Sequence, residues 1–185
     1  MLNAKRLKYL YLSYLSKPAG DRVLYRAIGR RKVRKILEIG MGPSRRTLRM
    51  IDLAGRVSRG ESVRYAAIDL FETRPPESSP GLPLKETHKL LKSTRAHVQL
   101  IPGDPASALS RSANALANMD LVIISADYDE ASLAEAWFYL PRMLHANSAV
   151  YIESKTTATG MPQLTPLAAA DITRRAQPRR ARRAA

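Results

Sequence analysis

Short apolar runs alternate with longer segments of helical periodicity from residue 33 onward. This alternation is typical of βαβ units, in which helices cover a mostly parallel sheet. The runs predict strands at Lys35–Ile39, Arg64–Ile68, His97–Ile101, Leu121–Ser125 and Ala149–Glu153. The segments between them predict helices at Arg45–Arg56, Pro83–Lys92, Pro105–Ala117 and Asp129–Leu144. We therefore expect residues 33–154 to form a doubly wound α/β domain of about five strands.

Two helices are expected ahead of this domain, within residues 1–32. Apolar side chains at helical spacing indicate an amphipathic helix that ends before Lys17, and they are Leu7, Leu10, Tyr11, Tyr14 and Leu15. A second helix is predicted over Asp21–Arg30, with Asp21 as its N-cap. We expect both helices to cover one side of the domain.

Three further expectations follow from local composition. Thr73–Pro83 contains four prolines and predicts an irregular surface loop. Residues 155–185 are rich in Thr, Ala, Pro and Arg and predict a basic, disordered tail. Trp137 shares a helical face with Leu133 and Leu140, so we expect it in the core.

The formal charge of +15 is concentrated at the two ends of the chain. Residues 1–49 hold 14 basic and 2 acidic side chains, residues 50–172 hold 11 and 14, and the last 13 residues hold 6 and 0. Basic ends favour contacts with nucleic-acid phosphates, although such tails also serve solubility alone. Nucleic acid is therefore one candidate partner.

Several classes of protein are disfavoured by composition. Without cysteine there is neither a disulfide framework nor a thiolate metal site, which fits the cytoplasm. No apolar run is long enough to span a membrane. The N-terminus begins like a secretory signal, but no small-residue cleavage site follows it, so export is not expected. His88, His97 and His145 lack ligand spacing, so no metal site is predicted.

Glycines and acids follow the predicted strands, where ligands of open α/β sheets bind. Glu38 lies near the end of the first strand, and the loop Gly40-Met41-Gly42 follows it, in which the two glycines allow a tight turn and close approach of a ligand. Asp69 follows the second strand, where it can accept hydrogen bonds from a ribose diol. Asp104 follows the third.

This series resembles the class I S-adenosylmethionine-dependent methyltransferases over roughly Val33–Glu153. The family pattern acid-x-Gly-x-Gly-x-Gly is matched by Glu38, Gly40 and Gly42, whereas Ser44 replaces the third glycine. The resemblance implies a Rossmann-like fold with strand order 3-2-1-4-5 and S-adenosylmethionine as the cofactor.

The resemblance also implies roles for individual residues. Glu38 and the loop Gly40-Met41-Gly42 would hold the methionine part, Asp69 the ribose hydroxyls, and Asp104 the adenine amino group. Leu70, Pro105 and Ser125 complete the expected cofactor-binding set.

Other nucleotide sites and hydrolase motifs fit less well. A dinucleotide fingerprint needs a glycine where Arg45 stands, and Asp69 lies 29 residues after Gly40 instead of about 20 beyond the fingerprint. The chain contains neither a Gly-x-x-x-x-Gly-Lys phosphate loop nor a Gly-x-Ser-x-Gly elbow.

The fourth strand resembles the metal-binding region of small-molecule O-methyltransferases, which reads Asp-Leu-Val-Phe-Ile-Asp-x-Asp-His. Ser125 replaces the first carboxylate of the closing Asp-x-Asp-His and Tyr128 replaces the histidine, so only Asp127 is kept. One carboxylate is a poor cage for a divalent cation, and we expect methyl transfer without metal. Asp127 is the candidate base, with Tyr128 and Asp129 positioning the acceptor.

Simpler interpretations remain open for several of these residues. Asp129 is expected foremost to cap the helix after it, and Asp104 also suits a helix cap. Arg45 and Arg46 open a helix whose dipole disfavours cations, so they either meet an anionic ligand or lie solvated at the surface, which we favour.

The chain departs from the family after the fifth strand. Members continue through a helix and an antiparallel hairpin, whereas 32 residues without two clear β-rich runs follow Glu153. We expect the sheet to stop at five strands or a partner to complete its edge. Three functions stay open: a methyltransferase with an unknown acceptor, a non-catalytic relative, and a nucleic-acid-binding protein. The oligomeric state is not predicted.

Overall fold

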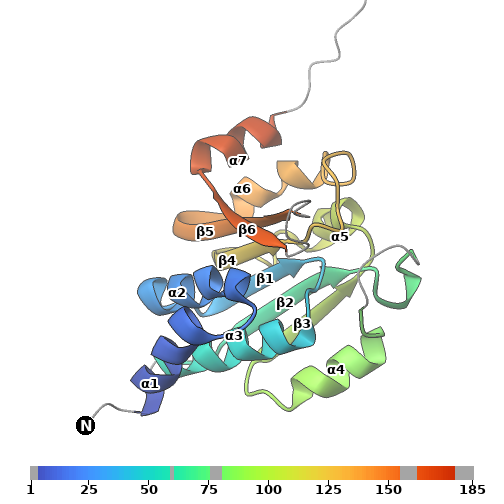
Figure 1. Cartoon of the computed structure of the whole chain (residues 1–185). Helices are drawn as coiled ribbons and strands as arrows, with labels where there is room; N and C mark the ends of the chain where they lie inside the picture. Colours follow the sequence, from blue (N-terminus) through green and yellow to red (C-terminus); the bar gives the residue numbers. More distant parts are fainter. Residues whose placement is uncertain (1–3, 59–60, 76–80, 155–161, 178–185) are drawn as a thin grey trace, which may run out of the picture.

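The computed structural model describes residues 4–58, 61–75, 81–154 and 162–177. Its centre is a six-stranded sheet in the order β3-β2-β1-β4-β5-β6 (Figure 1). The strands are β1 Lys35–Ile39, β2 Arg64–Asp69, β3 His97–Pro102, β4 Met119–Ile124, β5 Leu144–Ser154 and β6 Gln163–Leu167. The first five are parallel, which confirms the predicted order 3-2-1-4-5, and β6 is antiparallel to β5.

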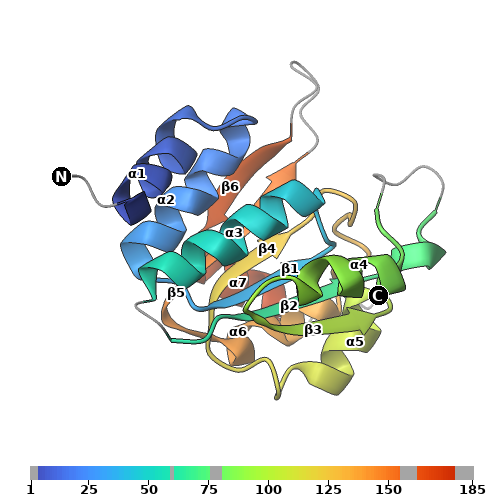
Figure 2. The same ribbon diagram turned by 90° about the horizontal axis from the view of Figure 1, so that it is seen from below.

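Helices cover both faces of this sheet, as Figures 1 and 2 show. One face carries α1 Ala4–Leu10, its π-helical continuation η1 Tyr11–Leu15, the 3-10 turn η2 Ala19–Asp21, α2 Arg22–Arg31, α3 Ser44–Val57 and α4 Leu84–Lys92. The other carries α5 Pro105–Ser112, the 3-10 turn η4 Ala136–Phe138, α6 Leu140–Met143 and α7 Ala169–Ala176. The two predicted N-terminal helices therefore lie on one side of the sheet.

β1 divides the core into two layers because its side chains alternate between the faces. Ile36 packs with Leu24 and Met50 on the α2 and α3 face, whereas Leu37 and Ile39 pack on the opposite face. β1 also lies between β2 and β4, so the chain winds outward from it in both directions. The carboxyl end of β1 is therefore the switch point at which ligands bind in such sheets.

Part of the predicted disordered tail is ordered. β6 pairs with β5 from Val150 to Ser154, and α7 buries Ile172 in the second core layer. Both elements lie within residues 155–185, so the prediction that this segment is disordered is wrong for them. The sheet does not stop at five strands, and this chain itself pairs the β5 edge. Residues 155–161 and 178–185 lie outside the described part.

The prediction of a single helix over Asp129–Leu144 is also wrong. Turns are followed by η4 and the single turn α6, and Leu144 already begins β5. Asp129 accepts hydrogen bonds from Ser132, and Pro141 lies in the first turn of α6. Trp137 is nevertheless buried, as predicted.

Smaller boundary differences remain. α5 ends at Ser112 instead of Ala117, and the Asp21 side chain makes no capping hydrogen bond. None of the helices in the described ranges is long and apolar enough to cross a lipid bilayer.

Candidate functional site

The turn after β1 packs directly against the end of β4. Gly40 has a φ of +79°, and its N–H donates a hydrogen bond to the carbonyl oxygen of Ile68 at 2.8 Å. A Cβ atom on Gly40 would lie 2.5 Å from the Cβ of Ser125 and 2.9 Å from a ring carbon of Tyr128. The turn therefore needs glycine for its backbone conformation and for the close approach of β4.

Gly40→Ala is expected to destabilise the fold by about 2–4 kcal/mol, since left-handed strain and overpacking add. Urea denaturation measures the change. Gly55→Ala in α3 is the matched control, because a Cβ there would have its nearest neighbour at 4.0 Å. That control should be neutral or stabilising. Equal losses in both variants would contradict the role given to the turn.

Asp69 ties the loop after β1 to the loop after β2. Its side chain is almost fully buried. One carboxylate oxygen accepts a hydrogen bond from the Met41 N–H at 2.6 Å, and the other accepts one from the Phe71 N–H at 2.7 Å. The predicted ribose-binding acid is thus at the switch point, held by backbone amides.

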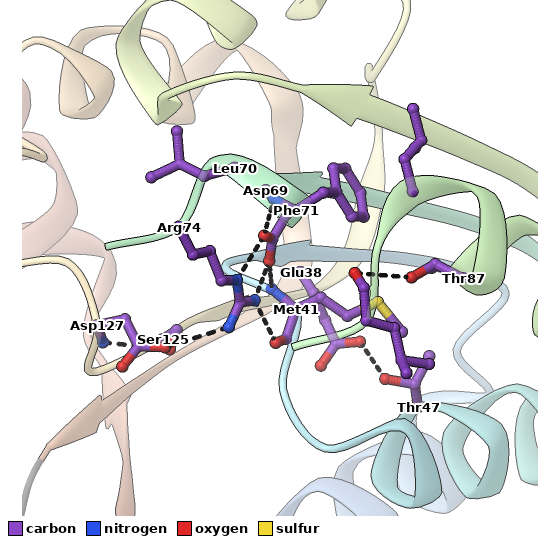
Figure 3. A network of polar contacts seen from close by, with 12 residues as sticks. Glu38, Met41, Thr47, Asp69, Leu70, Phe71, Arg74, Thr87, Ser125 and Asp127 are labelled. Atoms are coloured by element: carbon purple, nitrogen blue, oxygen red, sulfur yellow. Dashed lines mark hydrogen bonds and ion pairs between the residues drawn. The ribbon is translucent and has the colours of Figure 1, made fainter. Parts of the chain in front are cut away.

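Arg74 occupies the space in front of Asp69 (Figure 3). It donates to both carboxylate oxygens of Asp69, through Nε at 2.7 Å and through Nη2, and Nη2 also donates to the Met41 carbonyl oxygen at 2.9 Å. Its Nη1 lies 3.7 Å from Oδ2 of Asp127. We call this arrangement of Arg74 with Asp69 and Asp127 the Arg74 latch.

The cavity left beside the latch is small. Its volume is about 160 Å³, and its lining comprises Met41, Gly42, Pro43, Ser44, Asp69, Phe71, Arg74, Gly81 and Leu82. Sites that hold small molecules and cofactors usually measure roughly 300–1,000 Å³. Since Arg74 forms one wall, its withdrawal is the direct way to enlarge the cavity.

Ser125 and Asp127 lie at the end of β4, across from Asp69. Ser125 is buried, its N–H donates to the carbonyl oxygen of Ile39 at 2.8 Å, and its hydroxyl accepts the Asp127 N–H at 3.2 Å. This short turn aims the Asp127 carboxylate at Arg74. The candidate base and the candidate ribose-binding acid therefore meet at one guanidinium.

Tyr128 lies beside the same charges. Burial, followed by the negative charges of Asp69, Asp127 and Asp104, raises the pKa of the Tyr128 hydroxyl, and the Arg74 charge opposes this only in part. The hydroxyl therefore stays protonated at neutral pH and can donate a hydrogen bond to a ligand.

Asp104 is used in the structure as a helix cap. Its carboxylate accepts hydrogen bonds from the N–H of Ser107 at 3.0 Å and from the Ser107 hydroxyl at 2.6 Å. These bonds lower the pKa of Asp104. Pro105 is buried directly after it, in the first turn of α5.

Two further predicted site residues make local hydrogen bonds. Leu70, half-buried between Asp69 and Phe71, accepts a hydrogen bond at its carbonyl oxygen from the Thr73 hydroxyl. Asp129 likewise accepts hydrogen bonds from Ser132, but turns follow it instead of the helix that it was expected to cap.

Glu38 faces α3 and is fully buried. Its Oε2 accepts hydrogen bonds from the Thr47 hydroxyl at 2.7 Å and the Tyr65 hydroxyl at 2.6 Å. Burial and the neighbouring Glu38 charge hold the pKa of Tyr65 well above its usual value. The structure thus joins Asp69 and Asp127 through Arg74, while Glu38 serves a separate buried network.

That network is centred on Arg46, which is buried and not solvated at the surface as expected. Its Nη1 lies 2.6 Å from Oε1 of Glu153 and 3.9 Å from Oδ1 of Asp21, and its Nη2 lies 3.5 Å from Oε1 of Glu38. We call these four residues the Arg46 cluster. A Cβ on Gly42 would lie 1.9 Å from Nη2, so Gly42 makes room for this guanidinium.

Sequence reasoning missed Arg74 and the burial of Arg46. Arg46 precedes the buried Met50 and Leu53 by four and seven residues, so the helical spacing already placed it on the core face of α3. Arg74 lies in an aperiodic loop. Its signal was the pair of acids, Asp69 and Asp127, expected after the two strands that flank β1, since a buried acid with a second acid near it needs a cation.

Comparison with solved structures identifies the fold. The O-methyltransferase TomG of Streptomyces achromogenes, crystallised with S-adenosylmethionine, matches 83% of this chain at 14% identity with a TM-score of 0.52. An O-methyltransferase of Bacillus cereus, crystallised with S-adenosylhomocysteine, matches 82% at 14% identity with a TM-score of 0.54. This chain covers 66% of each of those chains.

Sequence comparison adds nothing to this result, since neither a protein-family model nor a curated protein matches. The identities are low, and the likeness rests on the arrangement of the strands and helices. The chain has the class I fold that these O-methyltransferases share.

Proposed function

We propose that this chain binds S-adenosylmethionine at the carboxyl ends of β1 and β2 and transfers its methyl group to an acceptor without using a metal ion. One observation carries the proposal. The acid predicted to hold the ribose, Asp69, and the predicted base, Asp127, contact the same guanidinium of Arg74. Both acids therefore lie within reach of one ligand at the switch point.

The side chains at this site have the chemistry to bind such a ligand. While the Arg74 latch is in place, however, the cavity is too small to hold it. Asp69 offers two carboxylate oxygens to a diol, and the turn at Gly40 brings backbone close to it. The cavity of about 160 Å³ is too small for a nucleoside while Arg74 stands in it. Binding therefore requires Arg74 to leave Asp69.

Each residue then has a separate task. Asp69 accepts hydrogen bonds from the ribose hydroxyls, and Asp127, released from Arg74, accepts the proton that an acceptor oxygen or nitrogen loses. Tyr128 donates a hydrogen bond that orients the acceptor. The cofactor supplies a methyl group already activated on its sulfonium sulfur.

Within the described residues no group of three or more His, Asp or Glu side chains could hold a metal ion.

Asp69→Asn is expected to weaken S-adenosylmethionine binding about tenfold or more, because the charge-assisted hydrogen bonds to the ribose are lost. Isothermal titration calorimetry measures the affinity. Asp171→Asn is the matched control, since Asp171 forms an ion pair with Arg174 on α7. Equal affinities in both variants and the unmodified chain would remove Asp69 from the site.

A non-catalytic role is the second candidate, and the Arg74 latch favours it. A guanidinium that already satisfies Asp69 and neutralises Asp127 leaves the fold intact without any cofactor. In that case neither the unmodified chain nor Arg74→Ala binds S-adenosylmethionine, which calorimetry on both proteins decides.

A further inference from the structure

An apolar stripe lies on the outward side of the first helix. Among the described residues the large hydrophobic side chains that remain exposed are Phe138 and five residues of α1 and η1, namely Leu7, Leu10, Tyr11, Tyr14 and Leu15. We call these five the outer stripe. Leu7 is 61% exposed and Leu15 is 68% exposed. So much apolar surface on one short helix indicates a binding surface.

The rest of this helix is firmly attached to the domain. Leu12 and Ser13 are buried, and Arg26 of α2 donates through Nη1 to the carbonyl oxygen of Ser13 at 3.1 Å. Lys8 forms an ion pair with Asp52 of α3 at 2.7 Å. Figure 2 shows α1 beside α2 at the outer edge of this face. The helix therefore presents the outer stripe on a fixed support.

The segment that carries the outer stripe is strongly basic: residues 1–49 hold 14 basic and 2 acidic side chains, and Asp52 of α3, which contacts this helix, is paired with Lys8. The acids of residues 1–49 are Asp21 and Glu38, and both are buried. Arg6, Lys17 and Arg30 are exposed. A partner must therefore bring negative charge together with a layer into which leucine side chains can enter.

The need for both negative charge and an apolar layer distinguishes between three possible partners: a second copy of the chain, a nucleic acid and a lipid bilayer. A second copy of the chain would bring two cationic surfaces together, which costs free energy. A nucleic acid supplies phosphates but no apolar layer for three leucines. An anionic lipid bilayer supplies both, and leucines with tyrosines on one side of a basic helix are the pattern of helices that lie in the membrane interface.

We propose that α1 and η1 dock the protein on the surface of an anionic membrane. The leucines of the outer stripe enter the boundary of the acyl chains, and Tyr11 and Tyr14 lie at the level of the headgroups. The surrounding Arg and Lys side chains attract anionic headgroups. This is a peripheral attachment that leaves the fold unchanged.

Cosedimentation of the full chain with two kinds of vesicle tests the proposal: pure phosphatidylcholine, and phosphatidylcholine mixed with phosphatidylserine. We expect binding to the anionic vesicles, weak binding to the neutral ones, and loss of binding at high salt. The triple variant Leu7→Ser, Leu10→Ser, Leu15→Ser should reduce the partition coefficient about tenfold or more.

Phe138→Ser is the matched control, because Phe138 is 48% exposed but belongs to η4 on the opposite face. It should bind like the unmodified chain, and thermal unfolding verifies that both variants are folded. Three results would each overturn the proposal. They are equal binding by the triple variant, a concentration-dependent dimer that only the triple variant disperses, and binding of single-stranded RNA but not of vesicles.

Discussion

Arg74→Ala is expected to increase the affinity for S-adenosylmethionine about tenfold or more, because the ligand no longer competes with a side chain for Asp69. The same change should destabilise the ligand-free protein by about 3–5 kcal/mol, since it leaves the buried Asp69 carboxylate without the guanidinium that pairs with it. Calorimetry and urea denaturation measure the two effects. Tighter binding together with a weaker fold is a combination that a purely structural arginine does not produce.

Arg74→Lys is the matched control for charge. It keeps a cation near Asp69 but cannot form the paired hydrogen bonds of a guanidinium. Its affinity should lie between those of the unmodified chain and Arg74→Ala. Weaker binding in Arg74→Ala than in the unmodified chain would mean that Arg74 holds the ligand and does not exclude it.

Arg46→Met is expected to produce the largest loss of stability, about 3–5 kcal/mol or more, because Asp21, Glu38 and Glu153 lose their shared buried cation. Arg45→Met is the matched control, since Arg45 is the exposed neighbour on the same helix. Urea denaturation should show little change for it.

The Arg46→Met deficit should also depend on pH. Burial is the main cause that raises the pKa of Asp21 in the folded chain. A group whose folded pKa is raised contributes stability at low pH and loses it as the pH rises through that pKa. The Arg46 charge opposes this effect, so its removal raises the folded pKa of Asp21 further. The deficit should therefore shrink from about pH 7 to about pH 5, and a constant deficit would contradict uncompensated charge as its cause.

Periodicity predicted the fold where each element is regular by itself. The central strands β1 and β4 are mostly apolar, with an unbroken apolar run over Leu121–Ile124 in β4, because both faces of the sheet are covered. α3 was predicted to within about one residue at each end because its helical periodicity is regular along its whole length. β6 was missed because its five residues include Pro166 and their pairing with β5 is a long-range contact.

Burial was easier to predict than local conformation. Leu133, Trp137 and Leu140 are buried, as their spacing indicated, yet turns and the short elements η4 and α6 carry them. A spacing of three and four residues fixes a common face, and it does not require an uninterrupted helix.

The candidate site divides in the same way. Acids at strand ends could be located from the sequence because the carboxyl ends of parallel strands share one edge of the sheet. The direction in which each of these side chains points could not be predicted from the sequence. Glu38 turns to α3, and Asp104 caps α5. Arg74 enters from a loop whose conformation no periodicity specifies.

The central claim is that the cleft at the carboxyl end of β1 binds S-adenosylmethionine once Arg74 yields. Titration of S-adenosylmethionine into the unmodified chain and into Arg74→Ala, with heat recorded, tests it most directly. We expect saturable heat with one ligand per chain in both proteins and the higher affinity in the variant. Absence of heat in both proteins at millimolar ligand would contradict it.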